Sequence, residues 1–477
     1  MEVYLMNIVV IVADSLRTDY VGSYGSDVRT PNIDGLAEDG VQFNQAYSEN
    51  LPTLPTRRSW WTGKYHFHEA GWQPFTSDDY LLAEVLWDQG YNSALITDTY
   101  HMHKPVYNCG RGFDTTAFIR GQEYDPWIVD DREIPAVEES EIHRLKGGTG
   151  RESDEVWRER YRQYLKNRTA YEEESDYPVA RVAREAINWL ERKSEVKARD
   201  FLLWVDMFDP HEPWDPPEPY RSTYKDPDYD GPDIVDPVPG SVEGYMDEDE
   251  VENTKNLYAG EVTMVDKYVG DIVEAMKGLG LYDDTLLVFT SDHGEPFGEH
   301  GYIRKARPKN YQNLVQIPWI MKGPNNRWAG KEVESVVQTV DLMPTFLDLL
   351  DIDSEELTLE FTEPKQSGKA ENIFPQDLTS KASRQQLGGQ SLVPLLEGEI
   401  DEIRDYAVGG HHNREWYLRT ERWTYLLPLD EGREPELYDR EKDPGEKENL
   451  IEDRPELAKN LELSLLRTVH SLNNQSD

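Results

Sequence analysis

Three strongly apolar segments, far apart in the chain, place the tightest constraint on its fold: 7–13 (NIVVIVA), 201–206 (FLLWVD) and 285–290 (TLLVFT). Nearly continuous runs of β-branched and aromatic residues are typical of strands that helices cover on both faces. Apolar residues recur at helical spacing in 251–279 and 341–350. Strands that alternate with helices predict an α/β protein with a doubly wound, mostly parallel sheet.

A carboxylate side chain follows each of these three segments, and a histidine also follows two of them. Asp14 follows the first, Asp292 and His293 follow the third as SDHGE, and Asp209 and His211 follow the second as FDPHEPW. Ligands of such sheets bind outside the carboxyl ends of the strands, where these residues would meet. A single Asp after a strand usually caps a helix or forms a turn. Their joint occurrence instead predicts a site for Ca²⁺, Mg²⁺, Mn²⁺ or Zn²⁺.

The stretch NLPTLPTRRS supplies a candidate nucleophile. Pro52 and Pro55 bracket Thr53 in a stiff loop, and Arg57 follows four residues later. A hydroxyl bound to a metal loses its proton more easily and can attack an ester. The planar guanidinium of Arg57 suits the charged oxygens of a tetrahedral anion. The alternative is that Thr53 only caps a helix.

The excess of acidic residues limits the kinds of molecule that the protein can bind. The chain carries 93 acidic and 50 basic residues, a net charge of −43, which would repel nucleic acid and anionic lipid. We interpret this acidity as halophilic, an adaptation to a salt-rich cytoplasm, with an acidic mesophilic protein as the alternative. The lone Cys109 excludes an intramolecular disulfide. No secretory leader and no apolar run of about 20 residues is recognisable, so we expect a cytoplasmic protein.

The segments between and after the strands suggest two domains. The charged, aromatic segment 122–177 is interpreted as a helical insertion in a catalytic domain spanning 1–375. Two short strands are expected in 415–427 and an amphipathic helix in 454–472. These elements predict a smaller C-terminal α+β subdomain over 385–477.

Several longer motifs resemble those of one family. NIVVIVADSLRTDYVGSYG with TPNIDGLAEDGVQF, TLPTR with RSWWTGKY, DPHEPW and YDDTLLVFTSDHGEPFGEHGYIRK occur in the order seen in sulfatases. GGQSLVPLLEGE and ELYDREKDPGEKENL are similar to the C-terminal signatures of those proteins. The chain thus resembles the sulfatase family of the alkaline phosphatase superfamily. The resemblance implies an alkaline phosphatase-like fold and hydrolysis of a sulfate or phosphate ester.

The resemblance also assigns roles to individual residues. It implies as metal ligands Asp14, Thr53, Asp292 and His293. It implies as catalytic or substrate-binding residues Thr53, Arg57, His101, His211 and Lys305. One divalent cation is expected: Ca²⁺ by family, with Mn²⁺ or Zn²⁺ as alternatives because Ser15 and His293 stand where many sulfatases have Asp and Asn. A second metal would need another set, for which the candidates are Asp209, His211 and His300.

Thr53 departs from the family pattern and widens the range of functions. Sulfatases usually carry Cys or Ser at this position, oxidised to formylglycine, and Thr cannot form that aldehyde. No formylglycine is therefore expected, and the threonine hydroxyl itself would attack, which favours phosphate over sulfate. The alternatives are a phosphodiesterase or phosphonate monoester hydrolase, a phospho- or sulfo-group transferase, and a degenerate binding protein. The expected partner is a small-molecule or saccharide ester, without nucleic acid or membrane and with the oligomeric state left open.

Overall fold

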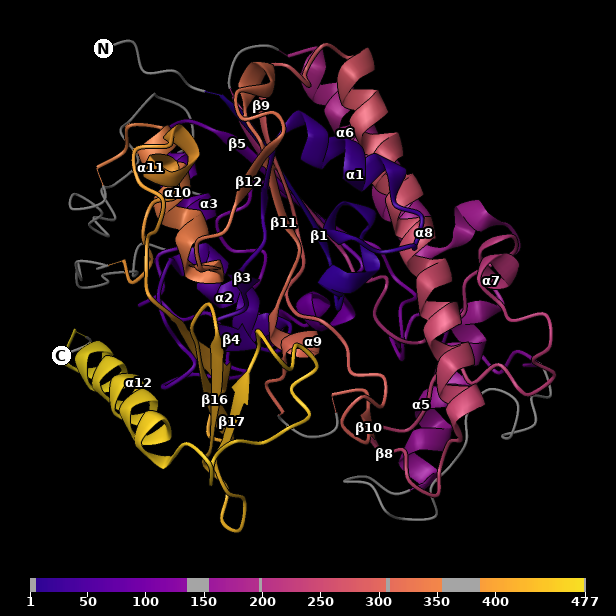
Figure 1. The fold of residues 1–477 in the computed structure, drawn as a ribbon. Coiled ribbons are helices and arrows are strands. Elements are labelled where there is room, and N and C mark those ends of the chain that lie inside the picture. Colours follow the sequence, from indigo (N-terminus) through magenta and orange to yellow (C-terminus); the bar gives the residue numbers. More distant parts are fainter. Residues whose placement is uncertain (1–5, 135–153, 197–199, 306–308, 354–386, 476–477) are drawn as a thin grey trace.

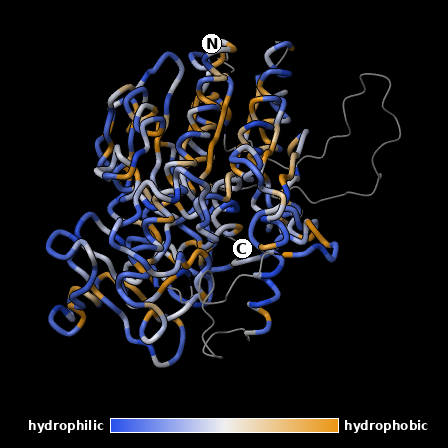
Figure 2. Tube along the Cα trace, turned by 90° about the vertical axis from the view of Figure 1, so that its right-hand side faces the viewer, coloured by the Kyte–Doolittle hydropathy of each residue, from blue (hydrophilic) through white to orange (hydrophobic). Residues whose placement is uncertain are grey.

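The structure is a computed structural model that describes residues 6–134, 154–196, 200–305, 309–353 and 387–475. A large central sheet lies between two layers of helices, and a smaller sheet and the last helix lie beside the lower end of this sandwich (Figure 1). Hydrophobic residues follow the strands and the inner sides of the helices, whereas the outer loops are hydrophilic (Figure 2).

The central sheet has eight strands, most of them parallel. Strand β11 runs antiparallel to both of its neighbours, β9 and β2, and the other pairs are parallel. This confirms the predicted α/β class with a mostly parallel sheet. From edge to edge the strands are β12 (Lys331–Val333), β2 (Val41–Phe43), β11 (Trp319–Lys322), β9 (Thr285–Thr290), β1 (Asn7–Ala13), β7 (Phe201–Met207), β5 (Asn92–Thr97) and β6 (Thr115–Phe118).

Both faces of this sheet are buried, which explains the continuous apolar runs. On β1, Val10 packs into one core and its neighbour Val9 into the other. Side chains that alternate across a strand must be apolar on both sides when helices cover both faces. One face packs against α1 (Pro31–Asp39), α6 (Pro178–Ser194) and α8 (Glu248–Gly278). The other packs against α2 (Leu54–Thr62), α3 (Leu82–Asp88), α10 (Leu342–Leu349) and α11 (Val393–Glu397).

The register of the central strands aligns their carboxyl ends. Val12 of β1 lies opposite Asp206 of β7 and opposite Thr290 of β9. Residues two positions beyond Val12 and Thr290 are Asp14 and Asp292. The parallel ladder therefore brings these two carboxylates to the same level of one sheet edge.

A second sheet pairs one short strand from the N-terminal part of the chain with four strands from its C-terminal part. Strands β14 to β17 form an antiparallel meander, and the short β4 pairs in parallel with β14. The expected strands of 415–427 and the helix of 454–472 are β15, β16 and α12. The predicted domain boundaries stay predictions, and the junction at 375–385 lies outside the described residues. The elements are β4 (Asn50–Leu51), β14 (Ala407–His411), β15 (Glu415–Arg419), β16 (Trp423–Pro428), β17 (Glu436–Asp439) and α12 (Pro455–Gln475).

The described part of the chain also contains several smaller elements. Within 122–177, the described part contains the helix α5, and 135–153 lies outside the described residues. No helix in the described part of the chain is long and apolar enough to cross a membrane. The remaining helices and strands are α5 (Asp154–Arg168), α7 (Tyr220–Thr223), α9 (Gln312–Val315), β3 (Ala46–Tyr47), β8 (Gly240–Ser241), β10 (Tyr302–Ile303) and β13 (Val337–Gln338).

Candidate functional site

Asp14 and Asp292 are tied together by the turn that follows β1. Ser15 has a left-handed backbone (φ 62°), and its amide donates a hydrogen bond to Asp292 Oδ1 at 3.0 Å. The Ser15 hydroxyl donates to Asp14 Oδ1 at 3.1 Å. Both carboxylates are fully buried, and burial together with the charge of Asp292 raises the pKa of Asp14. The turn thus holds two acidic groups side by side away from water.

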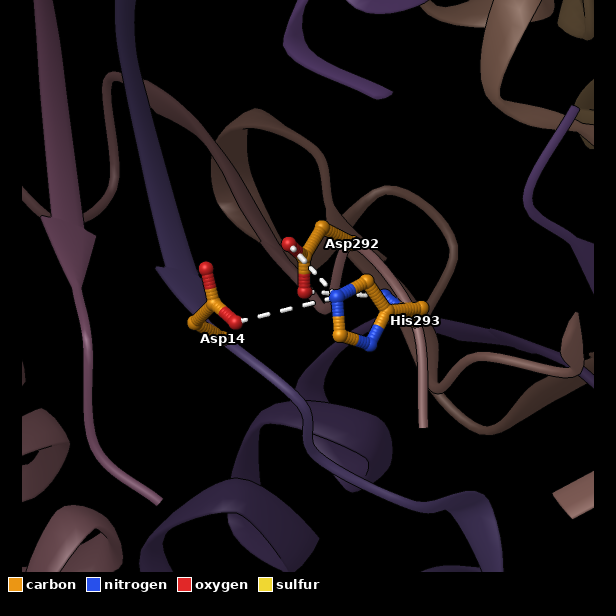
Figure 3. Close-up of side chains that lie close together, drawn as sticks. All are labelled: Asp14, Asp292 and His293. Atoms are coloured by element: carbon orange, nitrogen blue, oxygen red, sulfur yellow. Dashed lines mark hydrogen bonds and ion pairs between the residues drawn. The ribbon is translucent and has the colours of Figure 1, made fainter. Parts of the chain in front are cut away.

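His293 completes this group and presents an unpaired nitrogen to it. Its Nδ1 lies 2.8 Å from the carbonyl oxygen of Gly294, which can only accept, so Nδ1 carries the proton. Nε2 is buried without a hydrogen-bond partner, 3.5 Å from Asp292 Oδ2 and 3.9 Å from Asp14 Oδ1. Burial lowers the pKa of His293 to about 4, so the ring is neutral near pH 7. Figure 3 shows the three side chains converging from the ends of β1 and β9.

This arrangement fits a divalent cation. The ligand atoms of Asp14, Asp292 and His293 lie within 4.8 Å of one another. A lone pair on Nε2 that faces two carboxylates is repelled by them unless a positive charge lies between. Oxygen and imidazole nitrogen ligands suit Ca²⁺, Mn²⁺ or Zn²⁺. The structure therefore brings the three predicted Asp and His residues together, and their role as metal ligands stays a prediction.

Arg57 reaches into the same group from α2. Its Nη2 donates to Asp14 Oδ2 at 3.0 Å, and its Nη1 donates to Asp292 Oδ2. Nε and Nη2 together hold both oxygens of Asp206 at 3.1 and 2.7 Å. Nη1 also donates to the carbonyl oxygen of Thr53 at 3.2 Å. Every N–H of the guanidinium is used, so Arg57 fixes the strand ends of β1, β7 and β9 around the start of α2.

Thr53 lies at the first turn of α2 in an unusual backbone conformation. Its φ of 37° is rare for a β-branched residue and is held because Arg57 binds its carbonyl oxygen twice, through the amide and through Nη1. Its side chain makes no capping hydrogen bond to the helix. The alternative that Thr53 serves as a side-chain cap is therefore not what the structure shows. The hydroxyl stays available for another role.

Lys305 and His211 lie beside the group, each with a carboxylate neighbour. Lys305 Nζ donates to Glu212 Oε2 at 3.0 Å, to Ser15 Oγ at 3.3 Å and to Glu295. His211 Nδ1 donates to the Glu212 carbonyl oxygen at 2.9 Å. Although burial opposes it, Glu212 and Glu295 hold the pKa of Lys305 above its ordinary value. Burial keeps the pKa of His211 well below its ordinary value, so that ring is neutral.

His101 lies further out, in the short helical turn Tyr100–His103. Its Nε2 is 3.6 Å from Glu123 Oε2, and its ring meets the edge of Trp72 at 5.0 Å. Burial lowers the pKa of His101 to about 3. Its neutral ring therefore belongs to the rim of the site rather than to the cluster of Asp14, Asp292 and His293.

The candidate second metal set is not assembled. Asp209 Oδ1 accepts a hydrogen bond from Gln122 at 2.6 Å, and His300 stacks on Tyr311 with ring centroids 3.5 Å apart. Within the described ranges, the only other group of acidic and imidazole ligands is formed by Glu123, His211 and Glu212.

Several residues of the site have no motif in the sequence that predicts their role. Asp206 lies in the buried strand β7, and it binds Arg57 with both oxygens. A charged residue in an apolar strand needs a buried partner, and that rule was the available signal. Glu123, Glu295 and Arg304 carried no comparable signal, because they lie in loops without periodic pattern.

A comparison with models of known protein families shows the family to which the chain belongs. A family model named Sulfatase matches residues 6–352. The chain belongs to the sulfatase family. An arylsulfatase of Clostridium perfringens is 26% identical over 93% of this chain and 90% of the relative. An N-acetylglucosamine-6-O-sulfatase of Bacteroides thetaiotaomicron is 24% identical over 93% and 82%.

The fold of this sulfatase-family protein is also found in solved structures. The phosphonate monoester hydrolase of Agrobacterium radiobacter superposes with a TM-score of 0.71 at 23% identity, covering 98% of this chain and 96% of the other. The predicted alkaline phosphatase-like fold is thereby confirmed. The named relatives also bear out the prediction of an enzyme of the sulfuric ester hydrolase type. Members of the family bind a divalent metal, in agreement with the group at Asp14, Asp292 and His293.

Proposed function

We propose that this protein hydrolyses a sulfate or phosphate ester by direct attack of the Thr53 hydroxyl, with one divalent cation held by Asp14, Thr53, Asp292 and His293. The observation that carries the proposal is the unpaired Nε2 of His293, which faces two carboxylates that Arg57 ties to the Thr53 turn. When bound, such a cation would lower the pKa of a coordinated hydroxyl and withdraw charge from the ester oxygens.

Side chains of the protein would orient the nucleophile and protonate the leaving oxygen. Arg57 orients Thr53 through its carbonyl oxygen. The Thr53 hydroxyl would give up its proton to solvent, and Oγ1 would form a bond to sulfur or phosphorus as the bond to the leaving oxygen breaks. Lys305 or a protonated His211 would give the leaving oxygen its proton. Burial favours the neutral ring of His211 by lowering its pKa, and an anionic ester beside it would raise that pKa. Water would then hydrolyse the ester on Thr53 and restore the hydroxyl.

The charges of the site favour a monoanionic ester. Arg57 donates to three carboxylates, and Lys305 is paired with Glu212 and Glu295. Little positive charge is left for a phosphate monoester dianion. A sulfate monoester, a phosphate diester or a phosphonate monoester carries one charge less. This favours, as the second candidate function, hydrolysis of a phosphate diester or phosphonate monoester.

Two substitutions at one position test the nucleophile. Thr53→Ala should lower kcat by at least about a thousandfold, because removal of an attacking hydroxyl abolishes covalent catalysis. Thr53→Ser keeps the hydroxyl and should retain most of the activity. The assay compares an aryl sulfate with aryl phosphate mono- and diesters at high salt, with Ca²⁺, Mn²⁺ and Zn²⁺ in turn. Equal turnover by the Ala variant and the wild type would rule out Thr53 as nucleophile.

The same variants separate hydrolysis from group transfer and from binding without turnover. A group transferase would convert the ester only when a sugar or alcohol acceptor is added, and the product would carry the transferred group. A degenerate binding protein would bind the ester without turnover, and Thr53→Ala would leave its affinity unchanged. The saccharide sulfate named for the Bacteroides thetaiotaomicron relative supports a sulfated amino sugar among the first substrates to test.

A further inference from the structure

Glu123 is a buried carboxylate without a counter-charge of its own. It follows β6 in a left-handed backbone conformation (φ 46°) and is 5% exposed. Its Oε2 accepts no hydrogen bond and lies 3.6 Å from Nε2 of the neutral His101. Its Oε1 is 4.0 Å from Arg304 Nη2, beyond hydrogen-bond length. An ionised carboxylate buried in this way is costly unless something positive comes to it.

Arg304 and Lys305, the cations beside Glu123, pair with other carboxylates, and Lys104 Nζ lies over the Tyr100 ring, 4.9 Å from its centroid. Arg304 donates to Glu212 through Nε at 2.7 Å and to Asp236 through Nη1 at 2.6 Å. Lys305 donates to Glu212 and Glu295. Four buried carboxylates, counting Glu123, therefore share these two cations, and Glu123 is the one that neither cation contacts by hydrogen bond.

Aromatic rings surround His101, the neighbour of Glu123 Oε2. The His101 ring lies 4.0 Å from the Tyr100 ring and meets the Trp72 ring edge-on at 5.0 Å. Burial and the neighbouring carboxylate of Glu123 raise the pKa of the Tyr100 phenol. Trp72 is 38% exposed, so this cluster opens to solvent. A carboxylate beside aromatic faces is the combination that binds organic ammonium groups.

This cluster lies on the leaving-group side of the proposed reaction. Phe208 stacks on His211 at 4.1 Å and also faces His101 at 6.3 Å, which links the aromatic rim to the candidate proton donor. Lys305 donates to both Glu212 and Ser15, and Ser15 in turn contacts Asp14 and Asp292 of the proposed metal site. An ester bound at Thr53 with its leaving oxygen at His211 would extend its leaving group towards Glu123.

We propose that Glu123, together with the rings of His101 and Trp72, binds a positively charged nitrogen on the leaving group, so that the preferred substrate is the ester of an amino or ammonium alcohol. This inference rests on the proposed function, because it deepens the choice of substrate at the same site.

A second metal ion is the competing occupant of Glu123, and the surroundings disfavour it. Ligand atoms of Glu123, His211 and Glu212 do lie within 4.8 Å of one another. However, Glu212 already accepts from both Arg304 and Lys305, and a dication there would lie beside two positive charges. An organic monocation needs only the free side of Glu123 and leaves His211 available to the ester.

The test compares two alcohols of the same shape as ligands of the full, metal-loaded protein. Choline carries a trimethylammonium group, and its uncharged isostere carries a tert-butyl group instead. Titration calorimetry should show choline binding about tenfold more tightly. Glu123→Gln should abolish this preference by weakening choline binding about tenfold, while the affinity for the uncharged isostere stays at the wild-type level. Equal or undetectable binding of both alcohols by the wild type overturns the proposal.

Matched variants keep the result interpretable. Glu261→Gln is the control, because Glu261 is also buried with an unpaired Oε2, while its Oε1 accepts from the Asp215 amide outside this cluster. It should keep the choline preference. If Glu123→Gln does not fold, Trp72→Leu at the exposed rim should weaken choline binding and spare the isostere. Loss of one of two bound metal ions on Glu123→Gln would identify a metal site and overturn the proposal.

Failure of the proposed function would look different. An inactive wild type that still prefers choline, with the preference lost in Glu123→Gln, would refute hydrolysis and retain the ammonium site. An active wild type that binds both alcohols alike would refute only the ammonium site.

Discussion

Replacing Asp206 by Asn perturbs the anchor of Arg57 with almost no change of shape. Four donors converge on the two oxygens of Asp206. Oδ1 accepts from Arg57 Nη2 at 2.7 Å and from Thr99 Oγ1 at 2.8 Å. Oδ2 accepts from Arg57 Nε at 3.1 Å and from Trp204 Nε1 at 3.3 Å. Each oxygen therefore serves one N–H of the guanidinium and one other donor.

The number of donors that lose their acceptor sets the expected change in the free energy of unfolding. An Asn amide has one oxygen, and in either orientation its NH₂ would face two of the four donors of Asp206. Each buried donor left unsatisfied costs about 1–3 kcal/mol. Arg57 keeps Asp14 and Asp292, which limits the loss of charge compensation. We expect the free energy of unfolding to fall by about 3 kcal/mol, and kcat/KM to fall about 10- to 100-fold because the guanidinium is no longer fixed.

The assay measures both quantities and uses a matched variant. Asp266 is also buried, but it accepts from Asn32 and from the Ile33 amide at the start of α1, away from the site. Asp266→Asn should lower the midpoint of chemical unfolding and leave kcat/KM unchanged. Asp206→Asn should lower both. Wild-type kcat/KM in a folded Asp206→Asn protein would refute the reasoning that Asp206 orients Arg57.

Two further predictions concern stability. Burial raises the pKa of Glu49 to about 8 in the folded protein. The protonated Glu49 side chain therefore contributes its full stabilisation of the folded state below its ordinary pKa, and this contribution is lost as pH rises through about 8. Glu49→Gln should remove up to about 4 kcal/mol of this decline, measured by urea unfolding at several pH values; a parallel decline in both proteins would contradict it. At Gly409 a Cβ would lie 2.2 Å from the Glu49 carbonyl oxygen, so Gly409→Ala should destabilise by about 1–3 kcal/mol. Gly35→Ala, with no atom within 4 Å in α1, should stabilise by about 0.5–1 kcal/mol, and a reversed order of the two midpoints would be inconsistent with this packing.

The three strands near the site were predictable because apolar runs that are buried on both faces carry a strong signal, whereas their order in the sheet was not. The runs that form β1, β7 and β9 are apolar on both faces, and parallel pairing then sets Asp14, Asp292 and His293 at one edge. The pairing of β4 with β14 was not predictable. A strand of two residues has no period, and its partner lies at the far end of the chain.

The network behind the candidate site was not predictable for a related reason. Arg57 was expected to contact substrate, but its five N–H groups are taken up by the carboxylates of three strands and by Thr53. Sequence patterns report which face of an element is buried, not which buried charges pair across elements. The partner of a buried ion follows from tertiary packing, which the order of residues along the chain does not contain.

The charges around Arg57 give an independent reason to expect a divalent cation. Asp14, Asp206 and Asp292 place three buried carboxylates around one guanidinium. Burying uncompensated charges costs several kcal/mol for each ion. The two negative charges that Arg57 does not balance equal the charge of one divalent cation, and the unpaired His293 nitrogen faces the same space.

A cation that balances these charges must also stabilise the folded protein. Adding Ca²⁺ or Mn²⁺ at about a hundred times its dissociation constant to chelator-treated protein should raise the free energy of unfolding by about 2.7 kcal/mol. Asp292→Ala should abolish this response in thermal unfolding. Asp209→Asn should keep it, because Asp209 is a buried carboxylate bound to Gln122 outside the group. Metal ligands must be deprotonated, so the midpoint shift should grow as pH rises. A shift that is equal in the wild type and in Asp292→Ala would place the stabilising ion elsewhere and remove the charge argument for this site.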